Sequence, residues 1–216
     1  MTALTQGVTI SVMSSFATAA SSFRDNTEDR ALVLPFGDHW VVCVADGSGG
    51  MSGAAKAAEM FVAGTRRAVD SGTIDLDDPS AWVTLLKALD EEIERFPLAG
   101  ETTGIALAVT PTSVVGASTG DSRAWLFTES SYELTKNQAR KPRLGTGRAV
   151  PKPFATQARG TLVVGTDGLF DYAALDDIRA IVRAASPDAA DALVRLPGAR
   201  SRTLPDDVAV VVGWLD

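Results

Sequence analysis

The stretch that decides the fold is Val41–Gly50, VVCVADGSGG. Residues 41–45 are all apolar, which is typical of a β-strand buried in a sheet. Asp46 follows that run, and the glycines after it leave a loop without bulk, so a cation or a phosphate would fit close to the backbone. Taken alone, the same letters also fit a strand followed by a simple turn, because Asp-Gly is a strong hairpin signal.

Length, composition and charge limit the number of domains, the partners and the compartment that we expect. The chain has 216 residues, 45% of them hydrophobic, which is enough for one domain over residues 1–216 with a real core. Its net charge of −7 and its lack of a basic run argue against a nucleic-acid partner and against an anionic membrane surface. The single cysteine, Cys43, rules out an internal disulfide and favours a reducing compartment.

The N-terminal segment, MTALTQGVTISVMSSFATAA, lacks the basic start and the sustained apolar core of a signal peptide. No window reaches the roughly 18 apolar residues of a membrane span. We therefore expect a cytoplasmic protein with no membrane partner, acting as a monomer.

Hydrophobic periodicity predicts an alternation of strands and helices. Strands are expected over residues 8–18, 30–36, 39–45, 102–110, 113–119, 124–127, 132–135, 161–166 and 207–214, and helices over 52–69, 79–95, 175–185 and 188–196. Residues 136–153, with three prolines and six basic residues, are expected to form an irregular loop. The connections look like hairpins more than βαβ units, which indicates an α+β fold with mainly antiparallel sheets in layers.

Acidic residues mark the ends of several predicted strands. Two strands end alike, in VADG and GTDG, and the last strand is entered through a pair of acids. Since one antiparallel strand starts beside its neighbour's end, these acids are expected to gather at a single edge of the sheet. The positions concerned are Asp46, Asp121, Asp167, Asp206 and Asp207, with Glu28 and Asp29 in the adjoining loop.

Carboxylates gathered without partners repel one another, at a cost on the order of several kcal/mol. A divalent cation would offset that repulsion, and ligation by oxygen alone suits Mg²⁺ or Mn²⁺ better than Zn²⁺. Each acid by itself also fits a turn or a helix cap. Their conjunction is what favours a metal site.

Six motifs in one order resemble those of the type-2C metal-dependent Ser/Thr protein phosphatases. They are SFRDNTEDR (22–30), VADGSGG (44–50), ETTG (101–104), GDSR (120–123), VVGTDG (163–168) and PDDVAVVV (205–212). The resemblance covers nearly the whole chain from Arg24 onward. It implies a central sandwich of two antiparallel β-sheets flanked by helices, in α-β-β-α layers. It also implies two Mn²⁺ or Mg²⁺ ions at one end of the sandwich, where an activated water hydrolyses phosphoserine or phosphothreonine in proteins.

The resemblance assigns roles residue by residue. Asp46 would bridge the two metals, and the backbone carbonyl of Gly47 would ligate one of them. Asp167 and Asp206 would hold the other, with Asp206 chosen over Asp207 because the family ligand comes first in the pair.

Further residues of the resemblance surround these ligands. Glu28 and Asp29 would bind metal-bound water and orient the ligands, and Arg24 would grip the substrate phosphate. The alternative role for Arg24 is that of a charged loop side chain exposed to solvent. Asp121 matches a position that helps hold a third, weaker metal in bacterial members, but a turn role with Arg123 fits equally.

The chain departs from the family pattern in two places. Ser48 stands where some members carry a histidine as a candidate general acid, and the one histidine, His39, is expected to be a surface strand residue. The family's longer helical flap is replaced by the short basic loop of residues 136–153, either a solvated rim or an aid to recruiting phosphorylated substrates. Thr102 and Thr103 are expected only to pack or to hydrogen-bond locally.

These features indicate a compact bacterial phosphatase that reverses the action of a Ser/Thr kinase. The alternative is a catalytically weak pseudophosphatase that serves as a regulatory interaction module. A related branch, which acts on anti-sigma-factor antagonists, ranks lower because it generally lacks the arginine and the acid pair found here at Arg24, Glu28 and Asp29.

Overall fold

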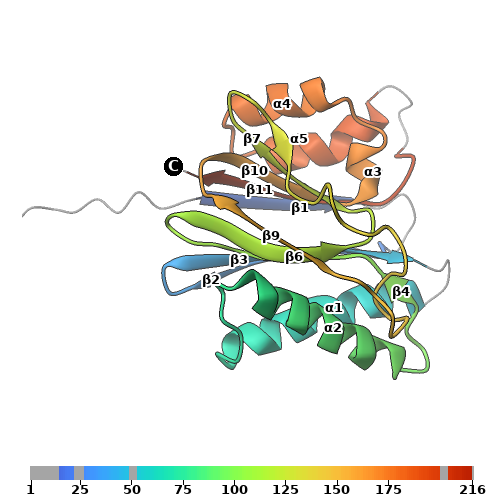
Figure 1. The fold of residues 1–216 in the computed structure, drawn as a ribbon. Helices are drawn as coiled ribbons and strands as arrows, with labels where there is room; N and C mark the ends of the chain where they lie inside the picture. Colours follow the sequence, from blue (N-terminus) through green and yellow to red (C-terminus); the bar gives the residue numbers. More distant parts are fainter. Residues whose placement is uncertain (1–14, 22–26, 49–52, 200–203, 216) are drawn as a thin grey trace, which may run out of the picture.

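Two antiparallel β-sheets lie face to face, and each is covered by helices on its outer side (Figure 1). The structure is a computed structural model, and it describes residues 15–21, 27–48, 53–199 and 204–215. Along these residues, no helix combines the length and the apolar character that a membrane span requires.

The first sheet, here called the β3 sheet, contains the predicted hairpin around Asp46. Its strands lie in the order β2 (Asp29–Phe36), β3 (His39–Ser48), β5 (Gly104–Val109), β6 (Ser113–Thr119) and β9 (Lys152–Gln157), and β4 (Glu101–Thr102) pairs with the end of β3. In the β2–β3 register Asp29 lies opposite Asp46, so two acids face each other at one end of this sheet.

The second sheet, here called the β11 sheet, is built around the last strand. Its order is β1 (Ser15–Ser21), β11 (Val208–Leu215), β10 (Gly160–Gly165), β7 (Arg123–Phe127) and β8 (Tyr132–Glu133). Gly165, the end of β10, pairs with Arg123 at the start of β7 and with Val210 near the start of β11. The residues just outside these strand ends are therefore neighbours in space.

Helices α1 (Gly53–Asp70) and α2 (Pro79–Glu94) pack on the β3 sheet. The helix α2 begins as its sequence predicts, with Pro79 in the first turn and the Asp78 carboxylate accepting a hydrogen bond from the Ser80 N–H. On the β11 sheet lie α3 (Asp167–Phe170), α4 (Leu175–Arg183), α5 (Ala189–Arg195) and the 3₁₀ turn Leu196–Gly198.

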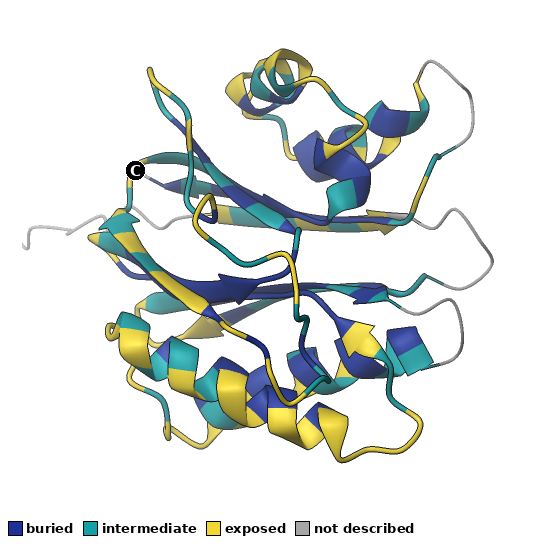
Figure 2. Cartoon of the chain, turned by 45° about the vertical axis from the view of Figure 1, so that its right-hand side comes forward, coloured by how far each residue is buried: buried dark blue, intermediate teal, exposed yellow. Residues whose placement is uncertain are grey.

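The apolar residues form three layers of core. One lies between the sheets, and one lies under each helical layer. Figure 2 shows the buried residues concentrated on the strands and on the inward sides of the helices. Fully buried side chains such as Trp82, Leu107 and Ile178 represent the three layers.

The expected α+β sandwich is confirmed, and the differences are local. The strand β3 runs on to Ser48, so Asp46 lies within a strand and not after it. The expected strand over 102–110 is divided into β4 and β5. Residues 152–157, expected in part to be loop, form the edge strand β9, whose mostly exposed sequence KPFATQ lacks a clear apolar alternation. Residues 8–14 of the first expected strand lie outside the described residues.

Candidate metal centre

Three carboxylates meet at one end of the sandwich. One oxygen each from Asp46, Asp121 and Asp167 lies within 4.8 Å of the other two. Asp46 belongs to β3, whereas Asp121 precedes β7 and Asp167 begins α3, directly after β10. The acids therefore meet across two sheets, and the expectation that they gather along one sheet edge is wrong. Both sheets end at this point, and two faces can surround an ion more fully than one edge can.

The peptide groups of Asp46 are held by the two threonines of ETTG. The Asp46 N–H donates to Thr103 Oγ1 at 2.9 Å, and the Asp46 carbonyl accepts from the Thr103 N–H at 2.9 Å and from Thr102 Oγ1 at 3.0 Å. Thr103 Oγ1 is also 2.6 Å from Ser122 Oγ, within GDSR. These threonines were expected to bond only locally; instead they link β3 to the turn that carries Asp121.

Gly47 lies where no side chain fits. A Cβ on Gly47 would come within 2.4 Å of the Ala54 carbonyl oxygen and 3.0 Å of the Glu28 carbonyl oxygen. The glycine lets α1 begin directly against the end of β3, beside Asp46. Gly168, next to Asp167, likewise allows a close approach of two backbone segments. A Cβ on Gly168 would lie 1.9 Å from the Asp207 carbonyl oxygen.

Burial and mutual repulsion raise the pKa values of these carboxyls. Burial first, then the charges of Asp29 and Asp167, raise the pKa of Asp46 to about 9. Burial and the charges of Asp207 and Asp167 raise the pKa of Asp29 to about 7, against a hydrogen bond from Thr166. The pKa of Asp167 is also raised, by burial and by Asp121 and Asp206. Without a cation, this end of the sandwich retains protons that ordinary aspartates would release.

The carboxylate of Asp29 has a buried oxygen without a hydrogen-bond partner among the described residues. Its side chain is only 3% exposed, and among the described residues nothing hydrogen-bonds to its Oδ2. A buried acceptor without a partner is costly, and a bound ion or its water would satisfy it. The residues present therefore fit a divalent cation.

The remaining expected residues lie around this cluster or outside the described chain. Asp207 Oδ2 accepts a hydrogen bond from the Glu28 N–H at 2.8 Å, which ties the residue before β2 to the residue before β11. Asp206 is exposed, accepts from the Asp207 N–H at 2.9 Å, and is not one of the three clustered acids. Arg24 lies outside the described residues.

The partner of Asp121 differs from the one expected. Arg123 pairs with Asp171 at 2.5 Å and donates to the Phe170 carbonyl at 3.2 Å, so the turn role of Asp121 with Arg123 is wrong. Asp121 is bound instead by Arg143, at 2.8 and 2.9 Å. Sequence reasoning missed Arg143, because its place depends on the path of an irregular loop that has no periodicity to read.

Cys43 and His39 lie away from this chemistry. Cys43 is fully buried in β3, and burial raises the pKa of its thiol to about 12, so it serves packing and not nucleophilic attack. His39 begins β3 at the opposite end from Asp46, with Nδ1 2.6 Å from Asp38 Oδ1.

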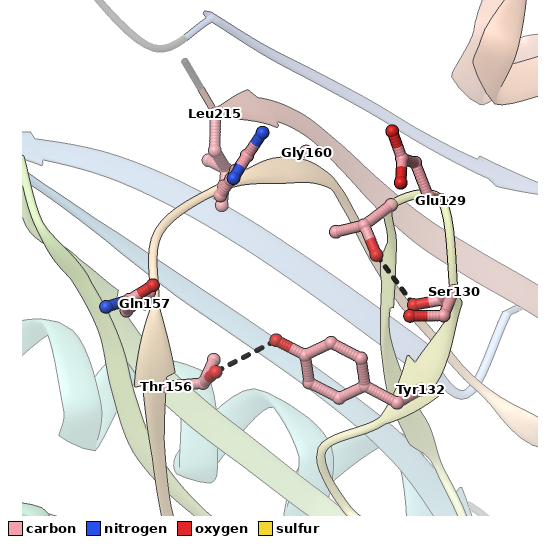
Figure 3. A pocket seen from close by; sticks show the side chains of 9 residues that line it. Glu129, Ser130, Tyr132, Thr156, Gln157, Gly160 and Leu215 are labelled. Atoms are coloured by element: carbon pink, nitrogen blue, oxygen red, sulfur yellow. Dashed lines mark hydrogen bonds between the residues drawn. The ribbon is translucent and has the colours of Figure 1, made fainter.

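A cavity of about 640 Å³ opens at the other end of the β11 sheet (Figure 3). Tyr132 and Thr156 join across it through a 2.9 Å hydrogen bond, and Glu129 and Arg159 contribute its charged side chains. It lies past the ends of β7 and β11 that are remote from Asp121 and Asp207, and it contains no member of the carboxylate cluster.

No family model and no curated protein matches the chain. Solved structures do. Serine/threonine phosphatase Stp1 from Staphylococcus aureus is 18% identical with a TM-score of 0.80, covering 94% of each chain. The catalytic domain of phosphatase PstP, in complex with two manganese ions, is 22% identical with a TM-score of 0.77, covering 94% of this chain and 99% of that one. PppA of Pseudomonas aeruginosa is 20% identical with a TM-score of 0.73, covering 94% and 98%. The chain therefore has the fold of bacterial serine/threonine phosphatases.

Proposed function

We propose that this protein is a metal-dependent phosphatase that hydrolyses phosphoserine or phosphothreonine in proteins. The observation that carries the proposal is the meeting of Asp46, Asp121 and Asp167 within 4.8 Å, with the pKa of Asp46 raised to about 9. The likeness of the fold to PstP, which was solved with two manganese ions, supports the same use of this end of the sandwich.

The proposed ligand set is the one that the family resemblance implies. Asp46 would be shared by two Mn²⁺ or Mg²⁺ ions, and the Gly47 carbonyl would ligate one of them. Asp167 and Asp206 would hold the other ion, and Asp206 is near enough for its charge to raise the pKa of Asp167. When bound, such an ion pair supplies an activated water and positive charge for phosphoryl transfer.

The chain's own residues would prepare that reaction. Thr102 and Thr103 fix the Asp46 peptide, so that its carboxylate need not reorganise when substrate binds. Glu28 and Asp29 lie on the adjoining turn, where the unpartnered Asp29 Oδ2 can accept a hydrogen bond from a water. Arg24 is proposed to bind the phosphate through a bidentate contact.

The substrate would be a phosphorylated protein made by a Ser/Thr kinase. The single, buried cysteine suits a reducing compartment such as the cytoplasm. The clustered acids give no support to the alternative of an inactive regulatory module.

The test is hydrolysis of a phosphothreonine peptide by the chelator-treated protein, with and without Mn²⁺. We expect activity only with metal, and a loss of at least about 100-fold for Asp167→Asn, as is typical when a group that stabilises transition-state charge is removed. Asp77→Asn is the matched control, since Asp77 is an exposed carboxylate near His39 at the far end of the sandwich. Activity that persists in chelator, or an active Asp167→Asn variant, would refute the proposal.

A further inference from the structure

We propose that the guanidinium of Arg143 takes the place of a further metal ion beside Asp121, so that this centre holds two divalent ions and no third. The inference rests on the proposed function, because it concerns the metal content of the same site. It assigns a role to a residue of the basic loop that the family motifs do not include.

The first observation is how Arg143 grips Asp121. Its Nη2 lies 2.8 Å from Asp121 Oδ1 and 2.9 Å from Oδ2, and the side chains are only 13% and 11% exposed. Its Nη1 donates to Ser48 Oγ at the end of β3. The guanidinium thus spans from the β3 sheet to the turn before β7, and both oxygens of Asp121 are engaged by one cation.

The second observation is that the backbone around Arg143 is fixed. Leu144, fully buried, exchanges two 3.0 Å hydrogen bonds with Thr102, the residue that also bonds to the Asp46 carbonyl. On the other side, the buried carboxylate of Asp90 in α2 accepts the N–H groups of the next turn. The donors are Gly145 at 2.7 Å, Thr146 at 3.0 Å, Gly147 at 3.0 Å and Ala149 at 2.8 Å.

This anchoring distinguishes Arg143 from its neighbour on the same carboxylate. Arg140 reaches Asp121 Oδ2 only at 3.4 Å, and its side chain is 67% exposed. An exposed arginine can turn into solvent when an ion arrives. The side chain of Arg143 is only 13% exposed, and the backbone next to it is fixed by the hydrogen bonds between Leu144 and Thr102.

The third observation is the charge balance. Arg143 places a positive charge against Asp121, in the same cluster as Asp46 and Asp167. A further divalent ion at Asp121 would face this fixed positive charge at short range and would have to draw the carboxylate away. That would strand a largely buried guanidinium whose Nε already has no partner among the described residues. The two functions of Asp121 therefore exclude each other.

The experiment measures the number of bound Mn²⁺ ions and does not depend on enzymatic turnover. Chelator-treated protein is titrated with Mn²⁺ to the millimolar range, with bound ions followed by calorimetry and free Mn²⁺ by paramagnetic resonance. The unaltered protein should bind two ions. Arg143→Gln, which frees Asp121, should bind a third, and adding Asp121→Asn to it should restore two. Arg140→Gln is the matched control and should bind two.

Asp121→Asn alone gives a test that does not depend on altering the loop. Because both oxygens of Asp121 are bound to the arginine, this variant should still bind two ions, although more weakly, since the arginine charge is then uncompensated beside the site. Three ions in the unaltered protein, fewer than two, an ion lost in Asp121→Asn, or no third ion in a folded Arg143→Gln would each overturn the proposal. If Arg143→Gln does not fold, the ion counts of Asp121→Asn and the unaltered protein decide. Two bound ions without peptide hydrolysis would refute the proposed function and leave this inference standing.

Discussion

Asp90 shows how one buried carboxylate can shape a loop that has no regular structure. It lies on the inner face of α2, 3% exposed, and takes four backbone N–H groups from residues 145–149. The sequence carries a signal for it, because Asp90 lies four residues after Leu86 and three before Ile93, on the apolar face of the helix. A charge in that position requires a partner, but the sequence does not say which.

We predict that Asp90→Asn lowers the free energy of unfolding by about 2–3 kcal/mol, since charge-assisted bonds become weaker ones and the amide group meets N–H donors. Urea denaturation measures the change, with Asp70→Asn as the exposed control, for which the change should stay within about 0.5 kcal/mol. The variant should also bind a third Mn²⁺ more readily than the unaltered protein, because one of the two anchors of the loop that carries Arg143 is weakened. Stability equal to that of the unaltered protein would contradict this account of the loop.

Among the site residues, the carboxylates could be predicted and their supports could not. Asp46, Asp121 and Asp167 end or precede apolar strands, so the strand pattern alone locates them. Thr103 lies in the ETTG motif and Arg143 in the basic loop, but both act through contacts of long sequence separation that the sequence does not reveal. Such residues become visible only when the fold brings β3, β4 and the basic loop together.

At the scale of elements, the prediction succeeds where a strand or helix is deeply buried. The helices α1 and α2 and the strands β3, β5, β6, β10 and β11 have long apolar patterns, so their types were predicted within a few residues. The edge strand β9 and the single-turn helix α3 were missed, because β9 is mostly exposed and α3, although buried, is too short at four residues to show a period. Both nevertheless contribute to the site: α3 begins with Asp167, and β9 closes the loop that carries Arg143.

The junction between β3 and α1 gives a prediction at this scale. Gly47→Ala would place a Cβ 2.4 Å from the Ala54 carbonyl oxygen, which must separate the strand end from the helix start. We expect a loss of about 1–3 kcal/mol in unfolding free energy, as is usual for overpacking, together with weaker Mn²⁺ binding. Gly37→Ala, in the β2–β3 turn with φ +63° and nothing near its Cβ, is the comparison. It should cost only about 1 kcal/mol of backbone strain and leave Mn²⁺ binding intact. Equal effects of the two changes on metal binding would contradict the role of Gly47.

At the scale of the whole molecule, the site lies where two sheets and two helical layers end together. The order of the motifs along the chain predicts the sandwich, and the antiparallel pairing carries the acids to one end of it. What the sequence could not supply is that the cluster draws on both sheets. That arrangement makes the charge of the site a property of the assembled fold, so the state of the site and the stability of the molecule are coupled.

This coupling predicts how metal-free protein responds to pH. Asp46 and Asp29 have folded-state pKa values of about 9 and about 7, both raised from 3.8. Between pH 4 and pH 7 the unfolded chain releases these two protons while the folded chain keeps them. Stability should therefore fall as pH rises, by up to about 1.4 kcal/mol per pH unit for each carboxyl. Asp29 should stop contributing near pH 7 and Asp46 near pH 9.

Mn²⁺ should act in the opposite sense, because it binds the deprotonated carboxylates and so stabilises the folded chain more as pH rises. Urea unfolding at pH 5, 6, 7 and 8, in chelator and in Mn²⁺, separates the two effects. Asp46→Asn removes the carboxyl with the pKa of about 9, so in chelator its stability should fall less steeply with pH, and its response to Mn²⁺ should largely disappear. If the metal-free protein were instead equally stable or more stable at pH 8 than at pH 5, the buried acids would have to be paired with charges in the folded chain.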